Sequence, residues 1–170
     1  SEMCIRDSDR AVLGVEICED LWVPLPPSTR MAQAGANVIV NLSASNEAVA
    51  KNDYRRAMIA QQSAKALCAY AYASAGVGES TTDLVFAGAC TVAENGTLLA
   101  DSPRFLLEGS EAVACVDLER LLSQRRQNGS FPDNATLVPP PAYRVIDAPV
   151  PALEEAQINR AYDKHPFVPD

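Results

Sequence analysis

The chain has 170 residues, of which 48% are hydrophobic and 21% charged, a size and composition that suit one globular domain or a piece of a larger one. Its formal net charge of -8 argues against a phosphate-binding surface, so nucleic acid is not an expected partner. No apolar stretch reaches the roughly 18 residues of a transmembrane helix, so we expect no membrane span.

Cysteine usage favours a reducing, cytoplasmic compartment. The chain has five cysteines, no two of which are spaced as CxxC, and a single histidine, His165, so a metal site is not expected. Cys68, Cys90 and Cys115 stand among small or apolar residues, a pattern that predicts buried, reduced thiols.

The chain begins with a polar stretch, "SEMCIRDS" at 1–8, which we interpret as a non-native or disordered leader. The short apolar run "AVLGVEIC" at 11–18 is typical of a strand that is covered on both faces. Three prolines in "DLWVPLPPS" at 20–28 predict a loop.

A helix and a second buried strand follow. Ser28 is a predicted N-cap for a helix that runs to about Ala34, and Gly35 is suited to end it. The run "ANVIVNLS" at 36–43 predicts a strand. Strand, helix and strand in this order predict parallel pairing with a right-handed crossover.

The next helix is predicted at 53–67, with Asn52 as its cap. The segment "CAYAYASAG" at 68–76 could continue this helix, but tyrosines alternating with small residues favour a strand. Arg55 and Arg56 are interpreted as part of a solvated helix face or an interface.

Beyond the polar loop "GESTTDL", Asn95-Gly96 predicts the turn of a β-hairpin. A further strand is predicted at 112–118 and a short amphipathic helix at 119–127. We therefore place the domain at 9–127. The Pro- and Asn-rich segment 128–162 is predicted to be its peripheral arm, and 163–170 the start of a linker.

Polar clusters follow each of the first three predicted strands: "CED", "SASNEAVAK" and "GVGESTTD". Ligands bind at the carboxyl ends of parallel strands, so Cys18, Ser45, Lys51 and Glu79 could converge on one pocket.

The motifs "GVEICEDLWVPLPPS", "NLSASNE" and "YASAGVGESTTDLVFAG" resemble the nitrilase-type glutaminase domain of glutamine-dependent NAD synthetases, and the likeness runs from about residue 9 to about residue 169. The resemblance implies an α/β fold, part of a nitrilase-like αββα sandwich (the carbon–nitrogen hydrolase fold), truncated at its N-terminal side.

The resemblance also implies roles for single residues. Cys18 would be the nucleophile that attacks the carboxamide of glutamine. Ser45 and Lys51 match contacts to the amino-acid head group, and a lysine suits the α-carboxylate. The backbone N–H of Glu19 could serve an oxyanion hole, and Glu79 could line the pocket or only order a turn.

Members of this superfamily use a Glu–Lys–Cys triad, whose Glu and Lys lie far upstream of the cysteine, and only 17 residues precede Cys18 here. Glu16, expected on the same face of the strand as Cys18, does not match the catalytic base. The chain is therefore interpreted as the C-terminal half of a glutaminase domain, with little activity of its own.

The expected partners are glutamine, the absent N-terminal half of the domain, an absent C-terminal NAD synthetase domain, and further copies in a homo-oligomer. No cofactor is expected in this chain, whereas the resemblance implies ATP and Mg²⁺ for the synthetase domain. Two alternatives remain: a stand-alone nitrilase-like amidase, and a non-catalytic fragment of the same fold.

Overall fold

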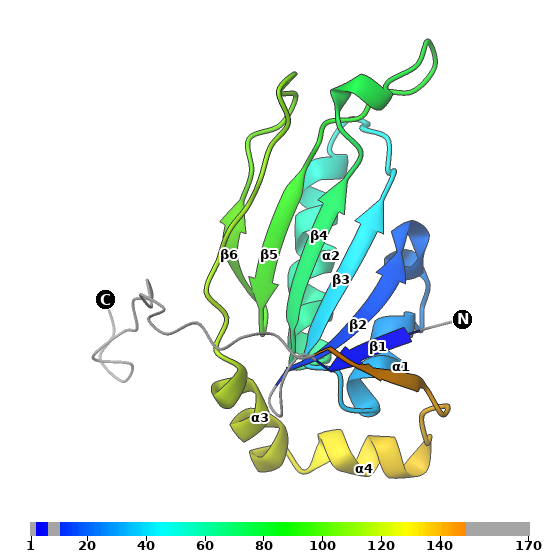
Figure 1. Ribbon diagram of the computed structural model, residues 1–170, viewed down its shortest axis with the longest axis vertical. Coiled ribbons are helices and arrows are strands. Elements are labelled where there is room, and N and C mark those ends of the chain that lie inside the picture. Colours follow the sequence, from blue (N-terminus) through cyan, green and yellow to red (C-terminus); the bar gives the residue numbers. More distant parts are fainter. Residues whose placement is uncertain (1–2, 7–10, 149–170) are drawn as a thin grey trace, which may run out of the picture.

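The computed structural model describes residues 3–6 and 11–148, which form one seven-stranded sheet with helices (Figure 1). The spatial order of the strands is β6-β5-β4-β3-β2-β1-β7. The strands are β1 (Met3–Arg6), β2 (Val12–Ile17), β3 (Val38–Ser43), β4 (Ala69–Ser74), β5 (Cys90–Glu94), β6 (Thr97–Asp101) and β7 (Arg144–Asp147). The helices are α1 (Pro27–Gln33), α2 (Lys51–Lys65), α3 (Leu118–Gln127), α4 (Ser130–Leu137) and two short 3-10 helices, η1 (Cys18–Trp22) and η2 (Val77–Glu79). None of these helices combines the length and hydropathy that a bilayer span requires.

The centre of the sheet is parallel. β3 pairs with β2 on one side and with β4 on the other, both in parallel, so the predicted strand–helix–strand unit is confirmed. The expected hairpin is also present. β5 and β6 pair antiparallel around Asn95 (φ 44°) and Gly96 (φ 87°), which have the positive φ values that a type I′ turn needs.

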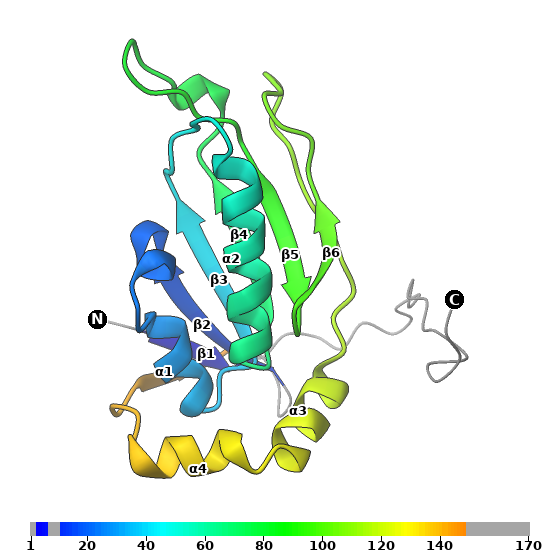
Figure 2. The same ribbon diagram turned by 180° about the vertical axis from the view of Figure 1, so that it is seen from behind.

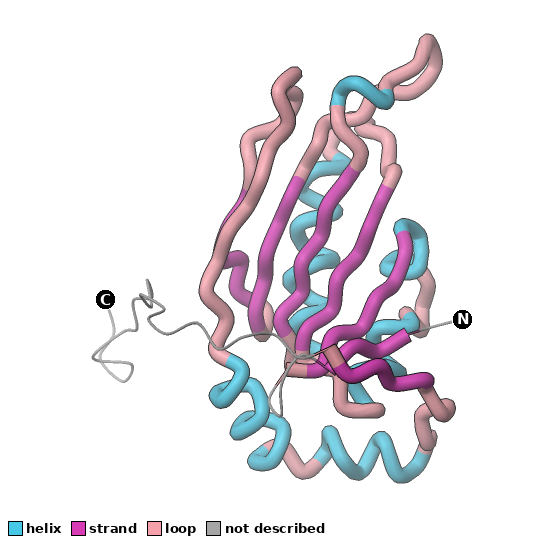
Figure 3. Tube along the Cα trace, in the orientation of Figure 1, coloured by secondary structure: helices cyan, strands magenta, loops and turns pink. Residues whose placement is uncertain are grey.

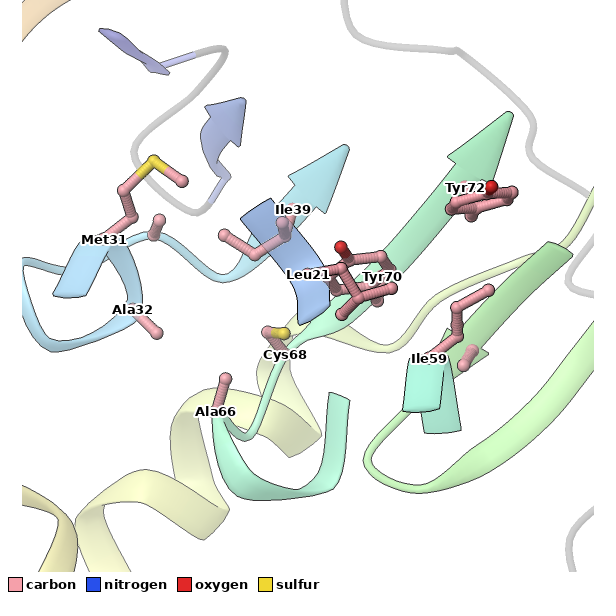
Figure 4. Packing of buried hydrophobic residues seen from close by; sticks show 11 residues of the cluster. Leu21, Met31, Ala32, Ile39, Ile59, Ala66, Cys68, Tyr70 and Tyr72 are labelled. Carbon is pink, nitrogen blue, oxygen red and sulfur yellow. The ribbon is translucent and has the colours of Figure 1, made fainter. Parts of the chain in front are cut away.

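Within residues 3–6 and 11–148, helices cover only one face of the sheet. Figure 2 shows α2 and α1 lying across this face, whereas the opposite face in Figure 1 carries no helix. Side chains of β3 alternate accordingly: Ile39 is fully buried under the helices, while Leu42 on the other face is 59% exposed. The core lies between the sheet and the helices, where Met31, Ile39 and Ile59 pack with Tyr70 (Figure 4).

Two local predictions at helix starts are wrong. Ser28 is not the N-cap of α1. The helix starts at Pro27 after the extended residue Pro26, and the Ser28 N–H donates to the Glu16 carboxylate at 2.8 Å. α2 begins at Lys51, so Asn52 lies within its first turn, and Ala50 adopts a left-handed φ of 62° before it.

The predicted strand at 112–118 is also absent: the segment between β6 and α3 is loop (Figure 3). It packs beside β5, where the Cys90 thiol contacts the Ser110 carbonyl at 3.6 Å, and it ends at Asp117, which caps α3. Without strand pairing, Cys115 is exposed and not buried as expected. Cys90, at the start of β5, is half-buried, also less than expected.

The ends of the chain also differ from expectation. Met3–Arg6, assigned to a leader by the sequence, form β1, which pairs with β2 on one side and β7 on the other. The backbone groups of β2 would otherwise be unpaired at a sheet edge. Part of the predicted arm forms α4 and β7, while 149–162 and the linker 163–170 lie outside the described residues.

Candidate active site

Cys18 occupies a constrained turn at the carboxyl end of β2. Its backbone φ is 49°, a left-handed conformation that is costly for a residue with a Cβ atom and is often found at functional sites. Two hydrogen bonds hold this turn. The Asp20 carboxylate accepts from the Ile17 N–H at 2.8 Å, and the Asn41 amide donates to the Cys18 carbonyl at 3.3 Å.

An open pocket of about 440 Å³ lies beside the Cys18 side chain, which is half-buried. The pocket forms where β2, β3 and β4 end together, as expected for a ligand site on a parallel sheet. It is lined by Ile17, Cys18, Leu42, Ser43, Ala44, Ala73, Ser74 and Ala75. Of the four residues expected to converge, Cys18 alone is among these lining residues.

Lys51 lies against the far end of the helix that Cys18 begins. Its ammonium group is 5.6 Å from the ring centroid of Trp22, the last residue of η1. The same group donates to the Asn46 carbonyl at 2.6 Å and to the Asn46 side-chain oxygen at 3.0 Å. This arrangement joins the loop after β3 to the Cys18 turn.

Ser45 is in that loop after β3 and is 7% exposed. The loop is anchored by Glu47, whose carboxylate forms an ion pair with Arg55 at 2.7 Å. The Arg55 side chain is fully buried, so its assignment to a solvated helix face is wrong. A buried arginine needs such a partner, and the glutamate that provides it was not singled out in the sequence.

Glu19 and Glu79 both point toward solvent. The segment that contains Glu79 forms a tight turn, in which the Ser80 hydroxyl accepts from the Phe86 N–H at 3.0 Å and the Thr81 hydroxyl accepts from the Leu84 N–H at 3.1 Å. Glu79 belongs to η2 at the end of β4 and is not among the residues that line the Cys18 pocket.

A buried polar layer lies under the Cys18 turn, and sequence reasoning missed its connections. Glu16 is 2% exposed, and its carboxylate accepts a short hydrogen bond from the Tyr70 hydroxyl as well as the Ser28 N–H. Burial raises the pKa of Tyr70, and the charge of Glu16 raises it further, so the hydroxyl stays protonated and donates.

Glu16 does not lie on the same face as Cys18, contrary to expectation. Side chains alternate along β2, and the turn at Cys18 interrupts this alternation through its positive φ. Glu16 is therefore directed to the helix-covered layer, while Cys18 and the exposed Ile17 line the pocket. The one signal in the sequence is an acid at a buried position of an apolar strand, which requires polar partners.

Residues 2–126 of the sequence match the model of the carbon–nitrogen hydrolase family. A glutamine-dependent NAD(+) synthetase from Mycobacterium tuberculosis is 44% identical over 161 residues, which cover 93% of this chain and 24% of that protein. The chain thus spans about a quarter of the length of this relative.

Solved structures give the same fold. A glutamine-dependent NAD(+) synthetase from Cytophaga hutchinsonii superposes with a TM-score of 0.53 at 25% identity, covering 64% of this chain and 17% of that one. A carbon–nitrogen hydrolase superfamily protein from Xanthomonas campestris superposes with a TM-score of 0.60 at 14% identity, covering 78% and 50%. The expected carbon–nitrogen hydrolase fold is confirmed, and the chain belongs to the carbon–nitrogen hydrolase family and is homologous to the glutaminase domain of glutamine-dependent NAD synthetases.

Proposed function

We propose that this chain supplies the nucleophile-bearing half of a glutaminase site that releases ammonia for NAD synthesis. The observation that carries the proposal is the position of Cys18, on a left-handed turn at the mouth of a pocket formed by three strand ends. The 44% identity to a glutamine-dependent NAD(+) synthetase supports glutamine as the substrate.

The reaction passes through a thioester. The Cys18 thiolate adds to the carboxamide carbon of glutamine, and a negative charge develops on the amide oxygen. Collapse of this intermediate breaks the C–N bond, and ammonia leaves after gaining a proton. Water then attacks the thioester carbonyl, releasing glutamate and returning the sulfur to Cys18. The N–H of Glu19 follows Cys18 directly and is the proposed donor to the developing oxyanion.

Lys51 and Ser45 are the proposed contacts to the amino-acid head group. An ammonium group carries three N–H donors, of which two are used by Asn46, so one remains for the α-carboxylate of glutamine. Both residues belong to the segment after β3 that adjoins the Cys18 turn through Trp22. Glu79 is proposed only as part of the pocket rim.

The general base and the oxyanion cation, a Glu and a Lys, are proposed to come from a segment outside this chain. The uncovered sheet face supports this proposal, because Ile17 is 64% exposed and Leu42 59%, and a second β layer would bury both. ATP and Mg²⁺ would act in a separate NAD synthetase domain, within a cytoplasmic homo-oligomer. The family's αββα sandwich would then be completed between the two halves.

A glutamine hydrolysis assay tests the proposal. The chain from residue 11 is fused behind the N-terminal part of the glutaminase domain of the M. tuberculosis relative, and ammonia release is compared with that of the chain alone. We expect glutamine hydrolysis by the fusion, none by its Cys18→Ala variant, and none by the chain alone. Substantial Cys18-dependent hydrolysis by the chain alone would instead make it a self-sufficient amidase.

A further inference from the structure

The peptide unit between Cys18 and Glu19 is held from one side by a buried amide. Asn41, on the neighbouring strand β3, is 1% exposed, and its Nδ2 donates to the Cys18 carbonyl at 3.3 Å. The same Nδ2 donates to the Tyr70 hydroxyl at 3.2 Å, and the Ser43 hydroxyl donates to the Asn41 Oδ1 at 3.0 Å. Both ends of the amide are thus fixed, and the Asn41 side chain cannot rotate without breaking hydrogen bonds.

Because the peptide between Cys18 and Glu19 is planar, the contact to the Cys18 carbonyl also fixes the direction of the Glu19 N–H. In a trans peptide the C=O and the N–H point in opposite directions. When Asn41 draws the Cys18 carbonyl toward the helix-covered layer, the Glu19 N–H is directed the other way. The pocket beside Cys18 lies at the strand ends and reaches that other side, where Ile17 and Leu42 are exposed.

We propose that Asn41 is a positioning residue for the oxyanion donor: by holding the Cys18 carbonyl, it aims the Glu19 N–H at the substrate carbonyl. The inference rests on the proposed glutaminase function. Asn41 does not itself touch substrate, so its contribution is made entirely through the orientation of one peptide plane.

Tyr70 and Glu16 extend this support. The Tyr70 hydroxyl accepts from Asn41 and donates to the Glu16 carboxylate, which also accepts the Ser28 N–H at the start of α1. A buried polar chain of this kind costs stability unless each member is bonded. These hydrogen bonds connect the Cys18 peptide to β4 and α1, the rigid elements around it.

The test separates oxyanion stabilisation from thiol reactivity. Glutamine hydrolysis and alkylation by iodoacetamide are measured on the full-length protein that carries this sequence. In alkylation the thiolate displaces iodide from a saturated carbon, forming an S–C bond with no oxyanion. An Asn41→Leu variant should therefore lose roughly 10- to 100-fold in kcat for glutamine, somewhat less than the 10²–10³ for loss of an oxyanion donor itself. Its KM and its Cys18 alkylation rate, as a function of pH, should stay within about two-fold of wild type.

Two tyrosines of β4 provide a milder variant and its matched control (Figure 4). Tyr70→Phe removes the hydroxyl that steadies Asn41 and should lower kcat in the same selective way, by a smaller factor. Tyr72→Phe makes the same chemical change on the same strand, and the Tyr72 hydroxyl has no hydrogen-bond partner among the described residues, so kcat should not change.

The outcomes are distinct. A wild-type protein without glutaminase activity would contradict the proposed function itself. An active wild type, with Asn41→Leu and Tyr70→Phe either fully active or equally impaired in hydrolysis and alkylation, would overturn the positioning role alone. Selective loss of kcat in both variants, with Tyr72→Phe unaffected, would establish it.

Discussion

At the scale of single residues, the surroundings of each thiol decide its chemistry. Two acids follow Cys18, but they do different things: the Asp20 carboxylate accepts the Ile17 N–H at 2.8 Å and holds the turn, while Glu19 points to solvent. Cys68 is buried in the core instead, and burial raises its pKa to about 12, so it stays a protonated thiol. The sequence distinguished these two cysteines through the small and apolar neighbours of Cys68, which predicted its burial, and through the motif around Cys18.

The raised pKa of Cys68 predicts a loss of stability at alkaline pH. An unfolded thiol titrates near its ordinary value of 9.0, whereas the folded one keeps its proton up to about 12. Between these values the unfolded state binds fewer protons, so the free energy of unfolding falls as pH rises, by up to about 1.4 kcal/mol per pH unit.

Urea unfolding at pH 8 to 11 checks this expectation. The difference in unfolding free energy between wild type and Cys68→Ala should shrink above pH 9, whereas Cys115→Ala, at an exposed position, should track wild type throughout. A constant difference between wild type and Cys68→Ala across this range would show that Cys68 does not titrate on unfolding.

At the scale of elements, short-range patterns predicted most strands of the sheet. They did not predict where α1 begins or that the segment before α3 is loop. The apolar runs of β2 and β3 and the Asn95-Gly96 turn are determined locally, so they could be predicted. The start of α1 could not, because the acceptor for the Ser28 N–H is the carboxylate of Glu16, 12 residues earlier in the chain. The 112–118 segment has a strand-like pattern, but it does not join the sheet and is loop up to the start of α3.

Arg125 of α3 is another long-range contact, and its role could not be distinguished from that of the adjacent Arg126 by sequence. Arg125 is 8% exposed, and its guanidinium lies at the C-terminal ends of two helices. It donates to the backbone carbonyls of Ala32, Ala36, Ala66 and Leu67 at 2.7–3.3 Å. A cation at this position satisfies carbonyls at the C-terminal ends of α1 and α2 and in the turns that follow them.

We expect Arg125→Met to lower the free energy of unfolding by about 2–4 kcal/mol, because it leaves several buried carbonyls without donors. Arg126→Met, at the exposed neighbouring position, should change it by less than about 0.5 kcal/mol. Chemical denaturation of the three proteins measures both. Equal, small effects of the two substitutions would mean that Arg125 does not clamp the helices.

At the scale of the whole molecule, the helices among the described residues cover one side of the sheet and leave the other side open. Ile17 and Leu42 are the most exposed of the large apolar strand residues on the uncovered face. A contiguous apolar face of this kind favours association. The apolar run at 11–18 predicted a strand covered on both faces, which is wrong for the described residues, since Ile17 of β2 is 64% exposed. The expectation of half a sandwich came from the family resemblance alone.

The isolated chain should therefore self-associate through this face. In sedimentation velocity, wild type is expected to show concentration-dependent oligomers, and the double variant Ile17→Lys with Leu42→Lys should shift toward monomer with an unchanged thermal midpoint. Leu107→Lys, at an apolar loop residue that is 89% exposed, should leave the oligomers unchanged. A monomeric wild type, or an equal shift toward monomer caused by Leu107→Lys, would argue against self-association through the uncovered sheet face.

Detection of the covalent intermediate tests the central claim most directly. The fusion of the N-terminal part of the M. tuberculosis glutaminase domain with this chain is mixed with glutamine, quenched in acid within milliseconds and digested. The mass of the peptide that contains Cys18 is then measured by mass spectrometry. We predict a glutamyl thioester on Cys18 at early times that disappears once glutamine is consumed. Glutamine hydrolysis with no acyl adduct on this peptide, or with undiminished turnover in Cys18→Ala, would contradict the assignment of Cys18 as the nucleophile.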